Sequence, residues 1–279
     1  DVDTRLTSVR GRALRAVREV RAGRLSWAFV ARRLRQIALD HSVKVAADRP
    51  ALTWAWTGPD TSIIEESVLG PYTRLRRLHT WDFDIELRQP VKFTGRQGVV
   101  LVDSMGPLHP DFSVLGVPTF VRPDVWFSGV RSWLSLISDN LGEPVTIAAH
   151  PRARPGSLDE RYAPFKVVHG SSRTLLANSK VLIAAEPSTA LGWGALYRTP
   201  VALIRVADFY PGHAAQMKAY SKELGVPVLE AADQVAPLLR DGELMPNPAF
   251  VGRFMVADGA PHIPFWESIL ADIQNVNGP

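Results

Sequence analysis

The sequence contains no cysteine. Disulfide bonds, zinc held by cysteine and a cysteine nucleophile are therefore excluded, and a reducing compartment is permitted. No apolar run approaches the roughly 18 residues that a membrane-spanning helix needs, and no signal peptide is visible. We therefore expect a cytoplasmic protein that spans no membrane. Because the chain begins with Asp1 rather than Met, we also expect a trimmed or incomplete copy.

Several nucleotide, cofactor and hydrolase motifs are also missing. The chain has no Gly-x-x-x-x-Gly-Lys loop, no Gly-x-Gly-x-x-Gly and no Gly-x-Ser-x-Gly, so ATPase, dehydrogenase and serine-hydrolase functions have no support. The seven histidines are scattered, and only the pair Asp82 and Asp84 has a spacing that suits a metal ion. We expect neither a metal ion nor a cofactor.

Positive charge is concentrated at the N-terminus. Residues 1–40 hold 10 Arg and four acidic residues, a net charge of +6, whereas residues 41–279 have a net charge of −2. Apolar residues at three- and four-residue steps predict one or two helices over residues 4–39. Their basic surface suits an anionic membrane, and the plain alternative is the solvated face of an ordinary helix. The neutral remainder of the chain argues against nucleic acid as a partner.

From Val99 onward, short apolar runs alternate with helix-like segments. Strands are predicted at 99–104, at the start of 145–156, and at 166–168, 181–185, 201–206 and 227–232; helices are predicted at 128–142, 173–179, 190–198, 211–225 and 233–240. This alternation predicts right-handed crossovers and a parallel sheet that is covered by helices on both faces. The expected fold class is therefore α/β with a Rossmann-like sheet.

The pattern also suggests how the chain is divided. We expect a smaller or incomplete N-terminal domain at residues 1–90, with a strand at 51–56 and a helix at 61–69. The Rossmann-like domain would occupy residues 91–262. Residues 263–279 would then supply an amphipathic closing helix that packs back on the N-terminal domain.

The segment LHTWDFDIEL, residues 78–87, alternates apolar and acidic side chains. This period of two predicts a strand with one apolar face and one acidic face. If that strand borders a cleft, Asp82 or Asp84 could serve as a general base. A solvated strand face is the alternative interpretation.

Polar side chains follow several of the predicted strands directly. They are Asp103, His150, Arg152, Ser188 and Thr189. In open parallel sheets, ligands bind beyond the carboxyl ends of the strands, so this common placement favours a ligand site. The guanidinium of Arg152 suits a phosphate group, because its planar fork binds oxyanions bidentately.

The two richest motifs are His150-Pro151-Arg152 and, some 36 residues after Arg152, Ser188-Thr189. Pro151 stops its strand and fixes the turn. Ser188 could do no more than cap the following helix, or it could offer its hydroxyl to an anion. If the two strands are neighbours, both motifs converge on one phosphate. Glu186, which precedes the Ser-Thr pair, could instead orient a ribose hydroxyl.

These runs resemble the C-terminal half of GT-B glycosyltransferases that build bacterial surface polysaccharides, in particular sialyltransferase-like and Kdo-transferase-like enzymes. The similar stretches are VVLVDSMGPLHPDF, IAAHPRA and LLANSKVLIAAEPSTALGWGALYRTPVALI. In such enzymes a His-Pro motif and a Ser-Ser or Ser-Thr motif bind the nucleotide phosphate of the donor. By position, the resemblance gives those roles to His150-Pro151 and Ser188-Thr189. Residues 1–77 are short for the complete N-terminal domain of that family.

The resemblance implies a metal-independent glycosyltransferase. The donor would be a nucleotide-sugar, with a CMP-sugar as one option, and the acceptor a surface glycan or a lipid-linked glycan. Two alternatives stay open: a nucleotide-sugar epimerase or pyruvyl-type transferase on the same fold, and a non-catalytic domain that binds nucleotide or glycan. An epimerase would alter the donor without an acceptor, and a binding domain would leave the donor intact.

The charge pattern generates one test of membrane association. We expect the protein to sediment with vesicles that contain anionic lipid, and we expect this binding to weaken as salt is raised, because salt screens the attraction of the arginines for the headgroups. Neutral vesicles are the control. Binding that does not respond to salt, or none at all, would contradict a peripheral position on the inner face of the cell membrane.

Overall fold

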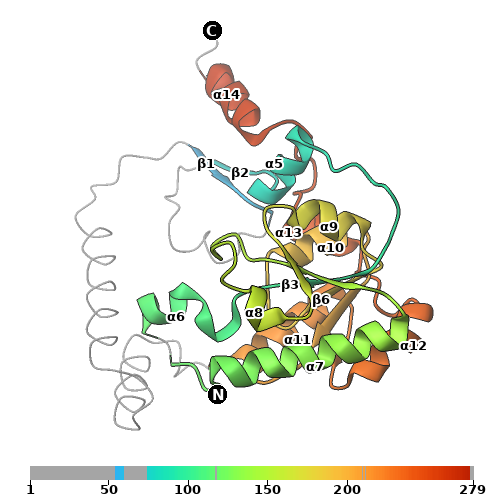
Figure 1. The fold of residues 1–279 in the computed structure, drawn as a ribbon. Coiled ribbons are helices and arrows are strands. Elements are labelled where there is room, and N and C mark those ends of the chain that lie inside the picture. Colours follow the sequence, from blue (N-terminus) through green and yellow to red (C-terminus); the bar gives the residue numbers. More distant parts are fainter. Residues whose placement is uncertain (1–53, 60–73, 117, 209, 211, 277–279) are drawn as a thin grey trace, which may run out of the picture.

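The structure is a computed structural model that describes residues 54–59, 74–116, 118–208, 210 and 212–276. The helices predicted at 4–39 and 61–69 lie outside these residues. Within them the chain forms a large sheet and a small sheet, with helices packed around both (Figure 1). No helix of this described part is long and apolar enough to cross a membrane.

The large sheet has six parallel strands in the order β5-β4-β3-β6-β7-β8. The strands are β3 (Val99–Val102), β4 (Val145–Ala148), β5 (Lys166–Val168), β6 (Val181–Ala184), β7 (Val201–Ile204) and β8 (Val228–Leu229). Every residue of β3, β6 and β7 is buried, as expected of strands that are covered on both faces. The predicted α/β fold with a Rossmann-like parallel sheet is therefore confirmed.

Successive side chains of a strand point to opposite faces, and the two cores of the domain follow from this. Val99 and Leu101 of β3 face a core made with α7 (Pro123–Leu141), α8 (Asp159–Tyr162) and α12 (Val235–Arg240). Val100 and Val102 face the opposite core. That core is made with α9 (Ser172–Asn178), α10 (Ala190–Leu196), α11 (His213–Leu224) and α13 (Ala249–Phe254). The remaining short helices are η1 (Gly106–Leu108), α6 (Pro110–Leu115) and η2 (Ala232–Gln234).

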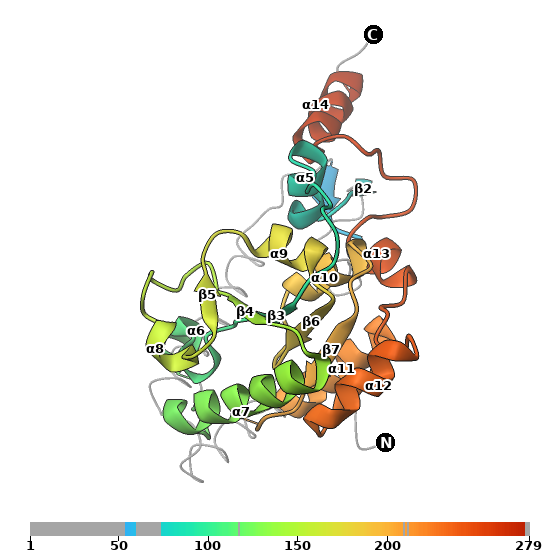
Figure 2. The ribbon, with the colours of Figure 1, turned by 45° about the vertical axis from the view of Figure 1, so that its right-hand side comes forward.

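The small sheet lies at one end of the molecule, beside the last helix (Figure 2). It pairs β1 (Trp54–Thr57) with β2 (Arg74–Arg77) in parallel. The closing helix is α14 (Phe265–Val276), and its Asp272 joins it to both strands. The indole of Trp56 donates to Oδ2 of Asp272 over 2.9 Å, and the guanidinium of Arg76 lies 3.1 Å from the same oxygen. The C-terminal residues therefore lie against elements that precede the large sheet.

The strand predicted at residues 78–87 is wrong, because this segment forms the helix α5 (Trp81–Arg88). Thr80 caps the helix by accepting a hydrogen bond from the backbone N–H of Phe83. Acidic residues occupy the first turn and Arg88 occupies the last, an arrangement that the helix dipole favours. Asp84 and Arg88 also form an i,i+4 ion pair at 2.9 Å. These local interactions favour a helix more strongly than the short alternation of apolar and acidic residues favours a strand.

The close packing of Gly106 on α7 generates a stability prediction. A Cβ atom added to Gly106, which has φ +47°, would lie 2.7 Å from Cδ1 of Trp126. Gly156 also has positive φ, at +80°, but a Cβ atom there meets nothing within 4 Å. We expect Gly106→Ala to lower the free energy of unfolding by about 2–4 kcal/mol, since it adds overpacking to backbone strain, and Gly156→Ala by about 1 kcal/mol. Urea unfolding measures both; equal losses would contradict the packing constraint.

Candidate functional site

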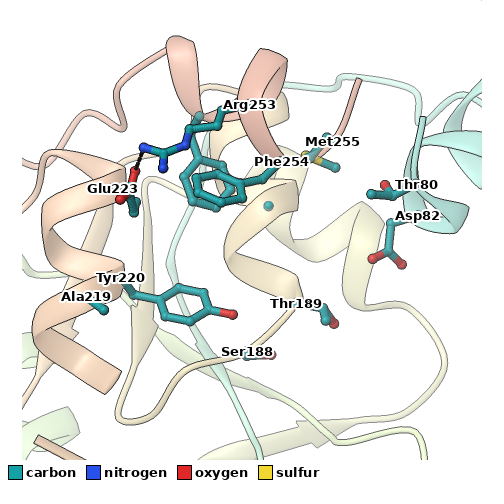
Figure 3. A pocket seen from close by; sticks show the side chains of 12 residues that line it. Thr80, Asp82, Ser188, Thr189, Ala219, Tyr220, Glu223, Arg253, Phe254 and Met255 are labelled. Atoms are coloured by element: carbon teal, nitrogen blue, oxygen red, sulfur yellow. Dashed lines mark hydrogen bonds and ion pairs between the residues drawn. The ribbon is translucent and has the colours of Figure 1, made fainter. Parts of the chain in front are cut away.

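A cavity of about 480 Å³ lies between α5 and three helices of the Rossmann-like domain, namely α10, α11 and α13 (Figure 3). Its lining comprises Thr80, Asp82, Ser188, Thr189, Gly192, Ala219, Tyr220, Glu223, Phe250, Arg253, Phe254 and Met255. Its volume falls in the range of small-molecule sites. Three side chains that the sequence singled out, Asp82, Ser188 and Thr189, therefore share one cavity.

Asp82 belongs to the first turn of α5 and is half-buried. Burial raises the pKa of its carboxyl group above the ordinary value of 3.8. Its carboxylate has no hydrogen bond or ion pair with any residue in the described part of the chain. An unpaired carboxylate with a raised pKa, facing a cavity, has the properties of a general base.

Ser188 and Thr189 follow β6 and precede α10. Oγ of Ser188 accepts a hydrogen bond from the backbone N–H of Ala190 over 3.2 Å, so part of the predicted capping role is present. Thr189 is the N-cap residue but makes no capping bond with its side chain. In Figure 3 Ser188 lies at the bottom of the cavity, and Thr189 lies between Ser188 and Asp82.

The opposite wall comes from α11 and α13 and is largely aromatic. Phe250 and Phe254 pack with their ring centroids 4.8 Å apart. The hydroxyl of Tyr220 points into the cavity (Figure 3). Arg253 lies at the rim and pairs with Glu223, with 2.6 Å between Nη1 and Oε2. The sequence did not indicate these residues: Tyr220 and Glu223 fall in the helix predicted at 211–225 without any motif, and the residues of α13 fall in no predicted element.

Asp84, the alternative candidate for the base, points away from the cavity. Its side chain is 1% exposed and is bound on several sides. It pairs with Arg88, accepts the backbone N–H of Phe265 over 2.7 Å and lies 3.4 Å from Nε2 of His79. In the structure Asp84 therefore anchors α14 to α5, and it is placed too deeply to contact a solute.

Asp103 ends the central strand β3 and is 2% exposed. Its carboxylate accepts three hydrogen bonds, from the backbone N–H of Met105 (3.0 Å), the backbone N–H of His150 (3.2 Å) and the hydroxyl of Tyr162 (2.7 Å). The sequence predicted Asp103 at a phosphate site, but in the structure these three donors occupy its carboxylate. Asp103 instead fixes the loops that follow β3 and β4.

The condition for the His-Pro and Ser-Thr motifs to converge on one phosphate, that their strands are neighbours, is not met. The strand order places β3 between β4, which leads to His150, and β6, which leads to Ser188. Strands two apart are separated by about 10 Å, farther than one phosphate can bridge with hydrogen bonds. His150 does not line the cavity of Asp82.

The surroundings of His150 favour the neutral form of its imidazole. Burial lowers the pKa of His150, and the neighbouring ring of His109, 5.1 Å away between centroids, lowers it further. Nδ1 accepts the backbone N–H of Arg152, which leaves the proton on Nε2 as a donor. Pro151 is exposed, and Arg152 pairs with Asp111 at 2.8 Å.

Glu186 is the most perturbed carboxyl group near the carboxyl ends of the strands. It is 8% exposed, and burial followed by the negative charge of Asp103 raises its pKa well above the ordinary 4.5. A hydrogen bond from the backbone N–H of Gly106 acts in the opposite direction. Its Oε1 has no hydrogen-bond partner among the described residues. A protonated carboxyl group accounts for this burial better than an ionised one.

A second, smaller cavity of about 250 Å³ lies at the carboxyl ends of β7 and β8. Its polar lining includes Arg205, Asp208, His213 and Glu230. Arg205 is paired with both acids, at 3.1 Å from Asp208 and 3.3 Å from Glu230. In the residues that the structure covers, no group of three His, Asp or Glu side chains is placed to hold a metal ion.

The chain matches no family model and no curated protein. Among solved structures, it is similar to the UDP-GlcNAc 2-epimerase of Methanocaldococcus jannaschii in complex with UDP-GlcNAc and UDP, with 10% identity, a TM-score of 0.38, and coverage of 69% of this chain and 49% of that one. It is also similar to the spinosyn rhamnosyltransferase SpnG complexed with spinosyn aglycone, with 12% identity, a TM-score of 0.35, and coverage of 59% and 46%. The chain spans less than half the length of both proteins, and the similarity assigns no family.

The buried acid generates a pH prediction. Because the folded protein holds the proton of Glu186 above pH 4.5 and the unfolded chain releases it, the free energy of unfolding should fall as pH rises from 4.5 to the folded pKa. The Glu186→Gln side chain cannot ionise. The variant should therefore lack the part of the decrease in unfolding free energy that Glu186 causes, about 1.4 kcal/mol for each unit by which its pKa is raised. Urea unfolding between pH 4.5 and about pH 8 measures the slope. The exposed Glu160→Gln is the control; a slope unchanged by Glu186→Gln would mean that Glu186 is ionised in the fold.

Proposed function

We propose that this protein is a glycosyltransferase that moves a sugar from a nucleotide-sugar donor to a hydroxyl group of an acceptor. The observation that carries the proposal is the shared cavity, where the unpaired carboxylate of Asp82 faces Ser188 and Thr189 at the carboxyl end of β6. A transfer of this kind needs a base on one side of the reacting carbon and hydrogen-bond donors to the leaving phosphate on the other.

On the acceptor side, Asp82 takes the proton of the attacking hydroxyl. The oxygen then forms a bond to the anomeric carbon of the donor sugar. Burial supports this role, because a raised pKa brings the basicity of Asp82 closer to the operating pH. Asp84 has no part in the step, since its carboxylate is occupied by Arg88 and Phe265.

On the donor side, the bond between the anomeric carbon and the phosphate oxygen breaks, and the nucleotide leaves with the electron pair. The hydroxyls of Ser188 and Thr189 donate hydrogen bonds to the negative charge that develops there. A nucleotide that extends from Ser188 across β3 would reach Nε2 of His150, which donates as a neutral imidazole. Arg152 can contribute if it exchanges Asp111 for the nucleotide.

Several finer features belong to the proposal and rest on the sequence. The donor is of the CMP-sugar type, the transfer needs no metal ion, and the acceptor is a surface glycan or a lipid-linked glycan. The arginine-rich residues 1–40 would hold the enzyme at the inner face of the cell membrane, close to such an acceptor. The sequence resemblance supports the donor, and the uneven charge supports the membrane position.

Two variants separate binding from chemistry. Asp82→Asn should bind nucleotide as the wild type does but lose transfer by about 10²–10⁴-fold, since it removes the base. Ser188→Ala combined with Thr189→Ala should weaken nucleotide binding by about 1–3 kcal/mol, since it removes hydrogen bonds to a charged group. Calorimetry with CMP, UDP, GDP and CDP measures binding, and product analysis measures transfer.

The control is Asp139→Asn, which neutralises an exposed acid on α7, far from the cavity. Full transfer by Asp82→Asn would show that another residue is the base. Unchanged nucleotide affinity in the double variant would show that Ser188 and Thr189 do not bind the nucleotide. A donor that is converted to its epimer without an acceptor would contradict the transferase and favour an epimerase.

A further inference from the structure

The cavity lining carries two carboxylates and one guanidinium, so its formal charge is negative. The guanidinium is that of Arg253, and it is already paired with Glu223 at 2.6 Å and packed over the ring of Phe254 at 5.0 Å from the centroid. The carboxylate of Asp82 has no cationic partner among the described residues. A second negative charge placed beside Asp82 would find no free cation in this lining to balance it.

Two hydroxyl groups add to the polar side of the cavity. Thr189 and Tyr220 both line it, and neither side chain makes a hydrogen bond within the described part of the chain. A hydroxyl can both donate and accept, whereas the ionised carboxylate of Asp82 only accepts. These three groups, set around one space, are suited to a ligand that carries several hydroxyl groups.

The remaining wall is apolar. It consists of the packed rings of Phe250 and Phe254 together with the side chain of Met255. A sugar ring has the matching division, since its hydroxyl groups project from the edge and its C–H groups form an apolar face. The volume of about 480 Å³ accommodates a ligand of that size.

We propose that this cavity is the acceptor subsite and that it selects a sugar ring or similar polyol that carries no negative charge. This inference rests on the proposed transferase function and narrows it. Uronic acids, sialic acids and phosphorylated sugars are excluded from the cavity by the charge of Asp82, and an amino sugar is tolerated. The phosphates of the donor lie at the border of the cavity, where the hydroxyls of Ser188 and Thr189 donate to them, and the acceptor ring occupies the rest of it.

The probes are methyl β-glucoside and methyl β-glucuronide, which differ only in a CH₂OH group against a carboxylate. Saturation-transfer NMR and titration should show that the glucoside binds the wild type at least about tenfold more tightly than the glucuronide. Asp82→Asn should reduce this ratio toward unity, because it removes the repelling charge. Asp139→Asn, the control on α7, should leave the ratio unchanged.

A second variant tests the charge argument in the opposite direction. Glu223→Gln removes the partner of Arg253 and frees its guanidinium at the rim of the cavity. The glucuronide should then bind more tightly than to the wild type, while the glucoside should change little. Phe254→Ala should weaken both glycosides if the aromatic wall holds the ring.

The outcomes separate this inference from the function on which it rests. Nucleotide binding together with equal or stronger binding of the glucuronide, or no binding of either glycoside, would overturn the acceptor subsite and leave the transferase standing. Displacement of the glucoside by cytidine or uridine would also overturn it, since the cavity would then hold the nucleoside. Selective binding of the glucoside without consumption of any nucleotide-sugar would overturn the transferase and leave the cavity as a site for neutral glycosides.

Discussion

The arrangement of the carboxyl ends of the strands depends on the buried carboxylate of Asp103. It stands at the end of the central strand and receives hydrogen bonds from Met105, His150 and Tyr162, so the loops after β3 and β4 are held by one group. A buried charge is tolerated only when it is well hydrogen-bonded, and three donors meet that condition. Its negative charge also raises the pKa of Glu186 at the end of the neighbouring strand β6. Asp103 therefore holds the His150 loop by a hydrogen bond and acts on the segment before Ser188 only through its charge on Glu186.

A second network places the proposed base. Glu86 of α5 accepts hydrogen bonds from Tyr197, just after α10, and from Arg173 of α9, with 2.9 Å to the guanidinium. Arg173 also packs over the ring of Trp193, at 5.3 Å from its centroid. These contacts fix α5 on the helix layer above the sheet, and Asp82 lies one turn earlier on the same helix. The cavity is thus built between two layers that are joined by charged and aromatic contacts.

The sequence predicted the large sheet well, because strands buried on both faces leave continuous apolar runs such as Val181–Ala184 that few other structures explain. It did not predict the spatial order of the strands, which placed β3 between the two motif loops and separated His150 from Ser188. The strand predicted at residues 78–87 was wrong. Capping by Thr80 and the ion pair of Asp84 with Arg88 stabilise a helix there, although apolar and acidic residues alternate as in a strand. The aromatic wall of the cavity could not be found, since Phe250 and Phe254 acquire their role only when α13 packs beside α10 and α5.

Hydrogen exchange with and without bound nucleotide tests most directly whether the active site is formed by the cavity of Asp82 and the neighbouring carboxyl ends of β4, β3 and β6. Exchange should slow in the peptides that contain Ser188 and Thr189, with a smaller effect around His150, since the nucleotide would lie across β3 between them. Exchange should also slow around Asp82 when an acceptor sugar is added. Protection confined to the second cavity, at Arg205 and Glu230, would mean that the nucleotide binds at the carboxyl ends of β7 and β8 and that the cavity of Asp82 is not the active site.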